Sequence, residues 1–336
     1  MTSLVPLIET MRGGTRENVH FGAVAVCDTR GRVLASAGDA QWLTFTRSTL
    51  KAMQALSFME SGGAQALRFT PPELALMCAS HNGEPVHVET AQAMLDKAGL
   101  TYKRLRCGCH VPYYVEQGVG PAPAHIDERM HNCSGKHSGF LAHCVHSGWD
   151  VATYLEPAHP LQQSVRAHVA RAAGLDASQM KMGIDGCSAP NYAMPLTALA
   201  RSYARLASGE RDGEFGASFA QLAAAMTAHP HLVSGTGRND LAFMQAGRGD
   251  WVTKVGAEGV QVFASASRGE AFAIKVSDGN KPALYAATVE VLAQLGWLDD
   301  AQREALRPWR GEDIPSIRGD VVGARRAVFK LSASSR

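Results

Sequence analysis

The sequence has neither an excess of charge of one sign nor a long apolar run, and both absences narrow its possible partners. Its 336 residues include 33 lysines and arginines against 31 aspartates and glutamates, a formal net charge of +2. No cluster of basic residues supplies the positive surface that nucleic-acid binding requires. No segment approaches the roughly 20 apolar residues of a membrane-spanning helix. We therefore expect neither nucleic acid nor membrane as a partner.

A secretion signal and paired cysteines are lacking as well. The start of the chain, up to Gly22, contains no apolar segment followed by a cleavage site of small residues. The seven cysteines are an odd number, and Cys107 and Cys109 lie too close in sequence to suggest a framework of disulfide bridges. These features predict a reduced, cytoplasmic protein.

The hydrophobic pattern predicts strands near both ends of the chain and helices between them. Residues 20–39 form two short apolar runs typical of a β-hairpin, and residues 251–279 form short apolar strands broken by glycines. Apolar residues at helical spacing begin after Ser48 and stop at Ser61, and Pro71 opens another helix. Helical spacing recurs over residues 85–98, 160–173, 195–207, 217–227 and 283–295.

This order predicts an α/β (α+β) fold in a single catalytic unit, residues 1–305. The N- and C-terminal strands, about residues 1–45 and 245–300, are expected to join in one antiparallel sheet. The helical part, about residues 46–244, then packs on that sheet or is inserted from it. No repeat or linker divides the chain. Residues 306–336 lack clear periodicity, so we expect an irregular C-terminal tail.

Ser48 and Lys51 form an S-x-x-K motif at the start of a predicted helix. Three residues along a helix bring both side chains to one face, so Lys51 can reach the Ser48 hydroxyl. A serine becomes nucleophilic when a neighbouring base takes its proton, and a lysine is that base only when neutral. The motif is weak by itself, because an N-cap serine followed by a solvated lysine gives the same pattern. Ser178 and Lys181 match it equally well.

Two further short motifs complete an ordered set. Ser80 and Asn82 form an S-x-N in a polar turn, and Lys254 and Gly256 form a K-x-G on a predicted strand. Each also fits ordinary turn or strand chemistry. In the order S-x-x-K, S-x-N and K-x-G, they match the arrangement in serine β-lactamases and penicillin-binding proteins. The candidate catalytic residues are therefore Ser48, Lys51, Ser80 and Lys254.

A second group of reactive side chains surrounds Cys133 and Cys187. Lys136 and His137 follow the first cysteine, and Asp185 precedes the second. Such a group could hold a metal ion, for which zinc is the best match. However, C-x-x-K with a distant single cysteine is no standard zinc spacing. From chemistry alone, free and partly buried cysteines are the simpler interpretation.

Together these segments resemble the rhizobial-type (class 3) L-asparaginases, over about residues 23–296. The resemblance depends on five segments: Arg47-Ser48-Thr49-Leu50-Lys51, Ala79-Ser80-His81-Asn82-Gly83-Glu84, Asn132-Cys133-Ser134-Gly135-Lys136-His137, Gly183-Ile184-Asp185-Gly186-Cys187 and Lys254-Val255-Gly256-Ala257-Glu258-Gly259. It implies a fold like that of serine β-lactamases and glutaminases, a homodimer, and hydrolysis of L-asparagine to L-aspartate and ammonia. It also implies two Ser-Lys pairs, Ser48 with Lys51 and Ser80 with Lys254.

The same resemblance implies a zinc ion near the catalytic serine, held by Cys133, Lys136, Cys187 and water. A neutral lysine amine is an unusual ligand, and its binding to a metal must release a proton. The remaining positions of the shared segments become candidates for contacts with the substrate: Arg47, Asn82, His137, Asp185 and Glu258.

We expect a double-displacement amidohydrolase in which Ser48 attacks the side-chain amide with Lys51 as general base. Ser80 and Lys254 would relay a proton to the departing ammonia, although the reverse order, with Ser80 as nucleophile, stays open. A glutaminase would perform the same chemistry on a substrate longer by one methylene. A β-lactamase or transpeptidase shares the motifs but normally carries an export signal. In a zinc- or redox-sensing protein, Cys133 and Cys187 would matter and Ser48 would not.

Overall fold

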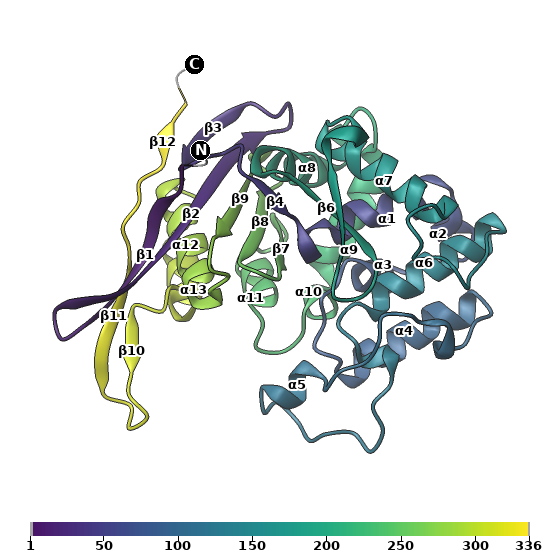
Figure 1. Ribbon diagram of the computed structural model, residues 1–336, viewed down its shortest axis with the longest axis horizontal. Coiled ribbons are helices and arrows are strands. Elements are labelled where there is room, and N and C mark those ends of the chain that lie inside the picture. The colour runs from purple at the N-terminus through teal and green to yellow at the C-terminus, as the bar shows by residue number, and fades with distance from the viewer. Residues whose placement is uncertain (1–2, 335–336) are drawn as a thin grey trace.

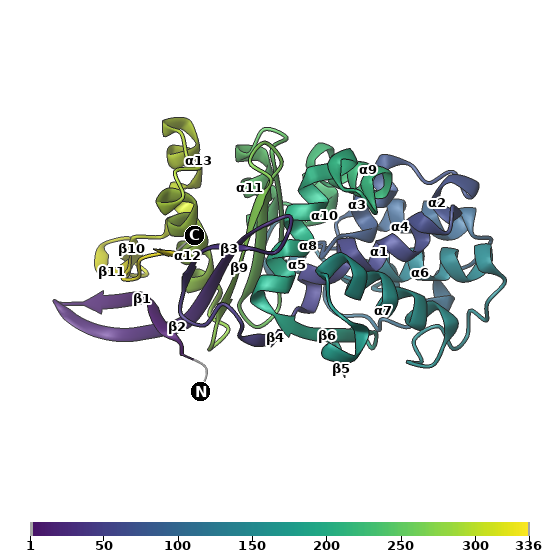
Figure 2. The ribbon, with the colours of Figure 1, turned by 90° about the horizontal axis from the view of Figure 1, so that it is seen from above.

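A nine-stranded sheet runs through the molecule with helices on both of its faces (Figures 1 and 2). The computed structural model describes residues 3–334. The strand order is β10-β11-β1-β2-β9-β8-β7, with β3 paired to both β2 and β12, and neighbouring strands are antiparallel. The strands of this sheet are β1 Val5–Arg12, β2 Thr15–Asp28, β3 Val33–Ala37, β7 Trp251–Gly256, β8 Val260–Ser265, β9 Glu270–Val276, β10 Asp313–Pro315, β11 Val321–Ala327 and β12 Ser332–Ala333.

Helices α12 (Lys281–Gln294) and α13 (Asp300–Arg310) lie on one side of the sheet, and α8 (Leu196–Ser208) lies on the other (Figure 2). The rest of the helical region packs beyond α8, around α1 (Lys51–Glu60). Its other α-helices are α2 Gly63–Ala66, α3 Pro71–Met77, α4 Pro85–Lys97, α5 Tyr113–Glu116, α6 Ser134–Ser147, α7 Pro160–Ala173, α9 Gly216–Ala228, α10 Pro230–Val233 and α11 Asn239–Ala246. In the described residues, no helix is both long enough and apolar enough to cross a bilayer.

The central strands supply residues to two separate hydrophobic cores. Successive side chains of a strand point to opposite faces of its sheet, so alternate residues of β2 and β9 divide between the two cores. Ala25 and Ala273 belong to the core shared with the helical region. Their neighbours Val26 and Phe272 belong to the core covered by α12 and α13. The central strands of the sheet are therefore buried on both faces, which explains their continuous apolar runs.

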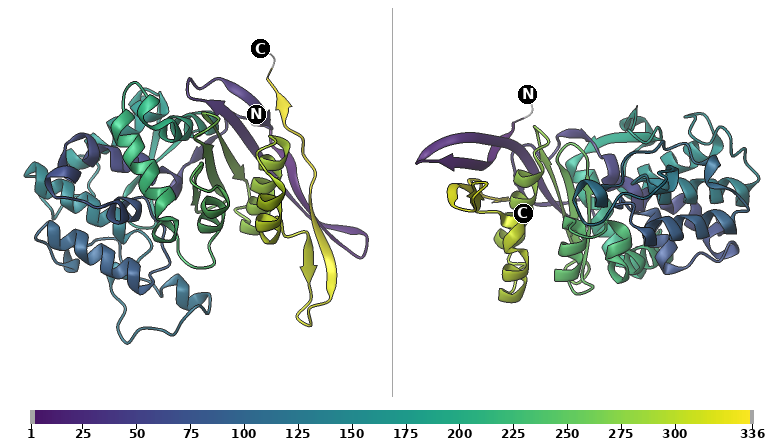
Figure 3. Two further views of the ribbon diagram at one scale, coloured as in Figure 1. Left: turned by 180° about the vertical axis from the view of Figure 1, so that it is seen from behind. Right: turned by 90° about the horizontal axis from the view of Figure 1, so that it is seen from below.

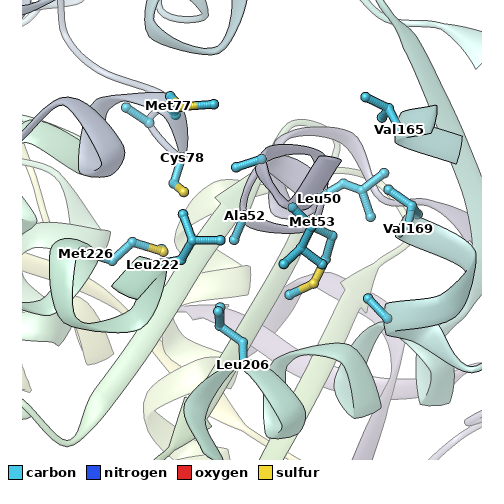
Figure 4. Packing of buried hydrophobic residues seen from close by; sticks show 14 of the residues in the cluster. Leu50, Ala52, Met53, Met77, Cys78, Val165, Val169, Leu206, Leu222 and Met226 are labelled. Atoms are coloured by element: carbon cyan, nitrogen blue, oxygen red, sulfur yellow. The ribbon is translucent and has the colours of Figure 1, made fainter. Parts of the chain in front are cut away.

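Packing around α1 fixes the position of the segment that carries Ser48 and Lys51. Leu50 and Met53 are fully buried, and Figure 4 shows their side chains close to those of Val165 and Val169 from α7. The side chain of Leu222, from α9, belongs to the same cluster. Fully burying one such side chain contributes roughly 1.5–3 kcal/mol. The start of α1 is thus held from several sides.

The predicted mixed fold, with an antiparallel sheet made of N- and C-terminal strands, is confirmed (Figure 3). The helical part also contains two strands that were not expected there, β5 (Lys181–Ile184) and β6 (Pro190–Pro195). They form a separate three-stranded sheet with β4 (Leu43–Phe45), which was assigned to the main sheet. These strands are short, so their periodicity is hard to detect in a sequence.

The prediction of an irregular tail over residues 306–336 is wrong for most of that segment. Helix α13 continues to Arg310, β11 pairs with β1 near the edge of the main sheet, and β12 pairs with β3. Strand β11 is exposed or half-buried along its whole length, so it lacks the apolar alternation that identifies a strand. Residues 1–2 and 335–336, the extremes of the predicted unit and tail, lie outside the described residues.

Candidate active site

Ser48 lies in the 3₁₀ turn Arg47–Leu50. Arg47, the residue before Ser48, has a strained backbone. Arg47 has a positive φ of 49°, a conformation that costs a non-glycine residue on the order of 1–3 kcal/mol. Asn191 of β6 holds this residue with two hydrogen bonds. The Arg47 N–H donates to Asn191 Oδ1 (3.0 Å), and Asn191 Nδ2 donates to the Arg47 carbonyl (3.0 Å). Because the turn continues directly into α1, Asn191 helps to fix the position of Ser48.

Gly256 lets strand β7 pass close to the same turn. A Cβ atom at Gly256 would lie 3.0 Å from the Thr46 carbonyl oxygen and 3.3 Å from the Arg47 side chain. Contacts this short would force one of the two segments to move. The glycine of the K-x-G motif therefore brings β7, which carries Lys254, next to Ser48.

Lys51 is hydrogen-bonded to Ser80. The Lys51 side chain is buried, and its Nζ donates to Ser80 Oγ (3.0 Å), to the Asn132 carbonyl (3.4 Å) and to the Ala79 carbonyl. Over residues 3–334, no hydrogen bond joins the Lys51 side chain to Ser48, although the Lys51 backbone N–H donates to the Ser48 carbonyl. Ser48 lies in the 3₁₀ turn whereas Lys51 is the first residue of α1, so the two do not share a regular helical turn.

Lys254 is also buried, but its partner is a carboxylate. Its Nζ lies 3.2 Å from Asp240 Oδ2 and donates to the Val255 carbonyl (2.8 Å). Burial lowers the pKa of Lys254 to about 8; Asp240 opposes this shift, and the charges of Lys51 and Arg238 add to it. Lys254 makes no hydrogen bond to Ser80 within the described residues. The predicted pairing of Ser80 with Lys254 is thus replaced by two pairs, Lys51 with Ser80 and Lys254 with Asp240.

Asp240, which the sequence analysis missed, is the centre of a buried polar network. Besides the Lys254 contact, its carboxylate accepts hydrogen bonds from the Val255 N–H (3.0 Å), Gln261 Nε2 (3.1 Å) and Asn239 Nδ2 (3.1 Å). A fully buried carboxylate requires such donors to remain charged. No motif surrounds Asp240 in the sequence, and only the packing of α11 against β7 brings it to Lys254.

A cavity of about 340 Å³ is lined by both Ser48 and Ser80. This volume is in the range typical of pockets for small molecules. Its wall also carries two cationic side chains, Arg238 and Lys281, and the carboxylate of Glu116. The aromatic side chains that line it are Tyr113, Tyr285 and Trp309. Two hydroxyls together with charges of both signs suit a small polar molecule.

Three of the predicted substrate contacts line a different cavity, of about 360 Å³. There Arg47 Nη2 lies 2.8 Å from Asp185 Oδ1, and Arg47 Nη1 lies 3.8 Å from Glu258 Oε1. These side chains are therefore paired with one another. Arg47, Asp185 and Glu258 thus line the second cavity and not the one that contains Ser48, and their role as substrate contacts stays a prediction.

The other two predicted substrate contacts, Asn82 and His137, are fully buried and do not line the first cavity. Asn82 lies behind its wall, where its Oδ1 accepts a hydrogen bond from Arg238 Nη1 (2.9 Å). The Nδ1 of His137 is 2.7 Å from the Tyr154 hydroxyl, and its Nε2 has no hydrogen-bond partner in the described residues. Burial lowers the pKa of His137. Neither side chain is therefore placed to contact a ligand bound in this cavity.

The structure does bring Cys133, Lys136 and Cys187 together in a buried cluster. Lys136 Nζ lies 3.0 Å from Cys187 Sγ, and Cys133 Sγ lies 3.0 Å from Asn132 Oδ1. A hydrogen bond from Cys133 and the charge of Lys136 hold the pKa of Cys187 well below its usual range, against the effect of burial. The described residues contain no group of three histidine, cysteine, aspartate or glutamate side chains that could hold a metal ion.

Asn132 connects this thiol cluster to the first cavity. Its side-chain oxygen faces Cys133, its Nδ2 donates to the Tyr113 hydroxyl (3.1 Å), and its backbone carbonyl accepts from Lys51. Asn132 also lines the cavity itself. Asn132 therefore contacts both the thiol cluster and Lys51, which is itself hydrogen-bonded to Ser80.

Comparison with known families gives one match that spans most of the chain. The family described as L-asparaginase II matches residues 8–327. This range contains the S-x-x-K, S-x-N and K-x-G motifs and the cysteine cluster. No match was found among curated proteins.

Solved structures give weaker likenesses. A β-lactamase from Mycobacterium bovis is 15% identical, with a TM-score of 0.44, over 81% of this chain and 94% of that one. A putative β-lactamase from Bacteroides dorei is 11% identical, with a TM-score of 0.45, over 81% and 93%. The native form of a protein called Mglu is 15% identical, with a TM-score of 0.37, over 82% and 64%.

Proposed function

Since the chain belongs to the L-asparaginase II family and is an L-asparaginase-type amidohydrolase, we propose that it hydrolyses L-asparagine to L-aspartate and ammonia through an ester on Ser48. The observation that carries this proposal is the 3.0 Å contact between Lys51 Nζ and Ser80 Oγ, beside a cavity that also contains Ser48. An amine hydrogen-bonded to one hydroxyl, with a second hydroxyl in the wall of the same cavity, has the components that acyl transfer requires.

In the first half-reaction, Ser48 Oγ attacks the side-chain amide carbon and its proton passes to neutral Lys51. Lys51 then donates to Ser80 Oγ while the Ser80 hydroxyl proton moves to the amide nitrogen. The C–N bond breaks, ammonia leaves, and an aspartyl ester remains on Ser48. The Ser48 N–H stabilises the tetrahedral oxyanion, and one such donor contributes roughly 10²–10³ in rate. The Lys51–Ser80 hydrogen bond supports this route for the proton.

In the second half-reaction, water attacks the ester carbonyl and gives its proton to Lys51. The C–O bond to Ser48 breaks, Ser48 recovers a proton, and L-aspartate leaves. Lys254 takes no proton in this scheme. Its ammonium group, which donates only to Asp240 and to a backbone carbonyl, polarises the site.

Trapping the intermediate tests both the reaction and the nucleophile. Rapid denaturation during turnover, followed by peptide mass spectrometry, should find the aspartyl group on Ser48, and Ser48→Ala should abolish the adduct. An adduct on Ser80 would exchange the roles of the two serines, and an adduct on neither would falsify the scheme. Ammonia release from L-asparagine and L-glutamine in parallel assays decides between an asparaginase and a glutaminase.

We also propose that Cys133, Lys136 and Cys187 hold a zinc ion. The chemistry of the donors supports this, since two thiols and an amine meet in a buried space with Lys136 Nζ 3.0 Å from Cys187 Sγ. His137 Nε2, buried and without a partner in the described residues, adds a polar atom near the cluster. Zinc, when bound, would supply a fixed positive charge that holds the pocket around Asn132 in place. Activation of the nucleophile stays with Lys51.

A homodimer and a cytoplasmic location complete the proposal. Exposed apolar side chains on the small sheet support a dimer: Leu43, Phe45, Met182 and Ile184. All seven cysteines are free, which suits a reducing compartment. Light scattering should give twice the mass of the chain, and Ile184→Lys, on the most exposed of these side chains, should shift it to that of the monomer. A monomeric parent protein would contradict this part.

A further inference from the structure

Arg238 is a cation in the wall of the first cavity, and no carboxylate neutralises it within residues 3–334. Its Nη1 donates to the amide oxygen of Asn82 (2.9 Å), and its guanidinium carbon lies 5.5 Å from the centre of the Tyr113 ring. Both contacts are with neutral groups. Its charge nevertheless lowers the pKa of Lys254, which shows that it acts electrostatically on the catalytic side of the cavity.

The neighbours of Arg238 fix its guanidinium group. The amide of Asn82 is oriented by donating from Nδ2 to the Thr236 carbonyl (2.8 Å) and to Glu84 Oε1 (3.3 Å), so its oxygen faces Arg238. Asn82 is fully buried. A planar guanidinium group that is held in place loses little conformational freedom when it binds an anion, and its parallel N–H groups match a carboxylate.

Lys281 is the other cationic side chain in the wall of the first cavity, but it is less well suited than Arg238 to bind a carboxylate. It is exposed, at the first turn of α12, and no hydrogen bond fixes its ammonium group within the described part of the chain. A flexible lysine loses more side-chain entropy on binding and cannot contact both oxygens of a carboxylate in one plane.

We propose that Arg238 binds the α-carboxylate of the substrate and thereby makes the enzyme specific for amides of amino acids. This inference rests on the proposed hydrolysis of L-asparagine. The side-chain amide then lies at Ser48 and Ser80, and the α-carboxylate lies against Arg238 in the same cavity. The interaction is made in the ground state and in the transition state alike, so its removal raises KM more than it lowers kcat.

The test compares two substrates that differ only in the α-carboxylate, L-asparagine and 3-aminopropanamide. Arg238→Gln keeps a hydrogen-bond donor for Asn82 and removes the charge, and Lys281→Gln is the matched control. For L-asparagine, Arg238→Gln should lower kcat/KM roughly 10- to 100-fold, mainly through KM. For 3-aminopropanamide, kcat/KM should stay within about twofold of the parent protein, as expected when the interaction is absent. Arg238→Lys should recover part of the loss.

Inhibition by product analogues provides a second readout. L-aspartate should inhibit the Arg238→Gln variant roughly tenfold less strongly, and 3-aminopropanoate, which lacks the α-carboxylate, should inhibit it as before. The role of Arg238 would be wrong if Lys281→Gln lowered kcat/KM for L-asparagine and Arg238→Gln did not, or if Arg238→Gln lowered it equally for both substrates. Either result would leave the proposed function in place. A parent protein that releases no ammonia from L-asparagine would overturn the proposed function and this inference together.

Discussion

The two lysines proposed to act in catalysis, Lys51 and Lys254, come from opposite sides of the fold and have different surroundings. Lys51, from the helical region, donates only to neutral oxygens, namely the Ser80 hydroxyl and two backbone carbonyls. Lys254, from the sheet, faces the carboxylate of Asp240. Both are buried, so burial alone does not distinguish their roles.

The difference indicates which lysine exchanges protons. A carboxylate neighbour stabilises the ammonium form, so Asp240 favours a charged Lys254. Among residues 3–334, no carboxylate forms an ion pair with Lys51, whose Nζ is hydrogen-bonded to a hydroxyl that can pass its proton on. Under the proposed mechanism, we therefore expect proton transfer on the helical side of the site and electrostatic polarisation on the sheet side.

Replacing Lys51 gives the largest expected effect. Lys51→Met keeps much of the side-chain volume and removes the base, so kcat should fall roughly 10²–10⁴-fold, the usual contribution of general acid–base catalysis. Steady-state ammonia release measures it, and circular dichroism checks folding. Lys181→Met, at the exposed lysine of the other S-x-x-K match, is the control. If Lys254→Met lost more activity than Lys51→Met, the assignment of roles would have to be exchanged.

Replacing Asp240 should move the pH profile in a predictable direction. As the pH rises through about 8, Lys254 loses its charge, and kcat/KM should fall. Asp240 raises this pKa, so Asp240→Asn should move the falling limb to lower pH by roughly 1–2 units. At pH 7.5 a downward shift of 1–2 units lowers the charged fraction of Lys254 roughly 3- to 25-fold, and the variant should lose activity by that factor.

A purely structural role for Asp240 would lower activity at every pH without moving the limb. Thermal unfolding separates the two effects, because loss of one partner from a buried ion pair costs about 3–5 kcal/mol of stability. A limb that stays in place, or that moves to higher pH, would show that Lys254 does not act as an ammonium group.

Much of the fold could be predicted from the sequence because many of its helices have apolar residues at helical spacing and clear boundaries. Ser61-Gly62-Gly63 ends α1, and Pro71 and Pro160 begin α3 and α7, as expected from the preferences of proline and glycine. Strand β11 could not be predicted because neither of its faces is buried. The small sheet was not predicted because one of its pairings, β4 with β6, joins segments more than a hundred residues apart.

For the candidate site, the motifs identified the residues but not their partners. Lys51 and Ser80 lie 29 positions apart and meet only because the Ala79–Ser80 loop packs against the start of α1. Asp240 and Asn191 belong to no motif. Each accepts a hydrogen bond from a backbone N–H that is distant in sequence, Asp240 from Val255 and Asn191 from Arg47. The resemblance suggested Arg47, Asp185 and Glu258 as substrate contacts, but it could not show that all three line the second cavity.

Lys136, a third buried lysine, extends the comparison to the thiol cluster. If it holds zinc with Cys133 and Cys187, then Cys187→Ser should reduce bound zinc from about one ion per chain to a small fraction, as measured by elemental mass spectrometry. KM for L-asparagine should rise about 10-fold while kcat changes less, because the lysines supply activation without the metal. Cys144→Ser, at a buried cysteine outside the cluster, is the control. Complete loss of turnover at saturating L-asparagine would instead make zinc part of the activation step.

The smallest effect is expected at the second S-x-x-K match, Ser178 with Lys181. Ser178 is exposed in a 3₁₀ turn, where its N–H donates to Asp176 Oδ1 (2.7 Å), and Lys181 is exposed on β5. Neither residue is buried beside a hydroxyl, so the pair lacks what distinguishes Lys51. Ser178→Ala should change the unfolding free energy by less than about 0.5 kcal/mol and leave kcat within about twofold. A large loss of kcat in this variant would mean that an S-x-x-K spacing matters here without the buried contacts, and the distinction between the lysines would then lose its physical basis.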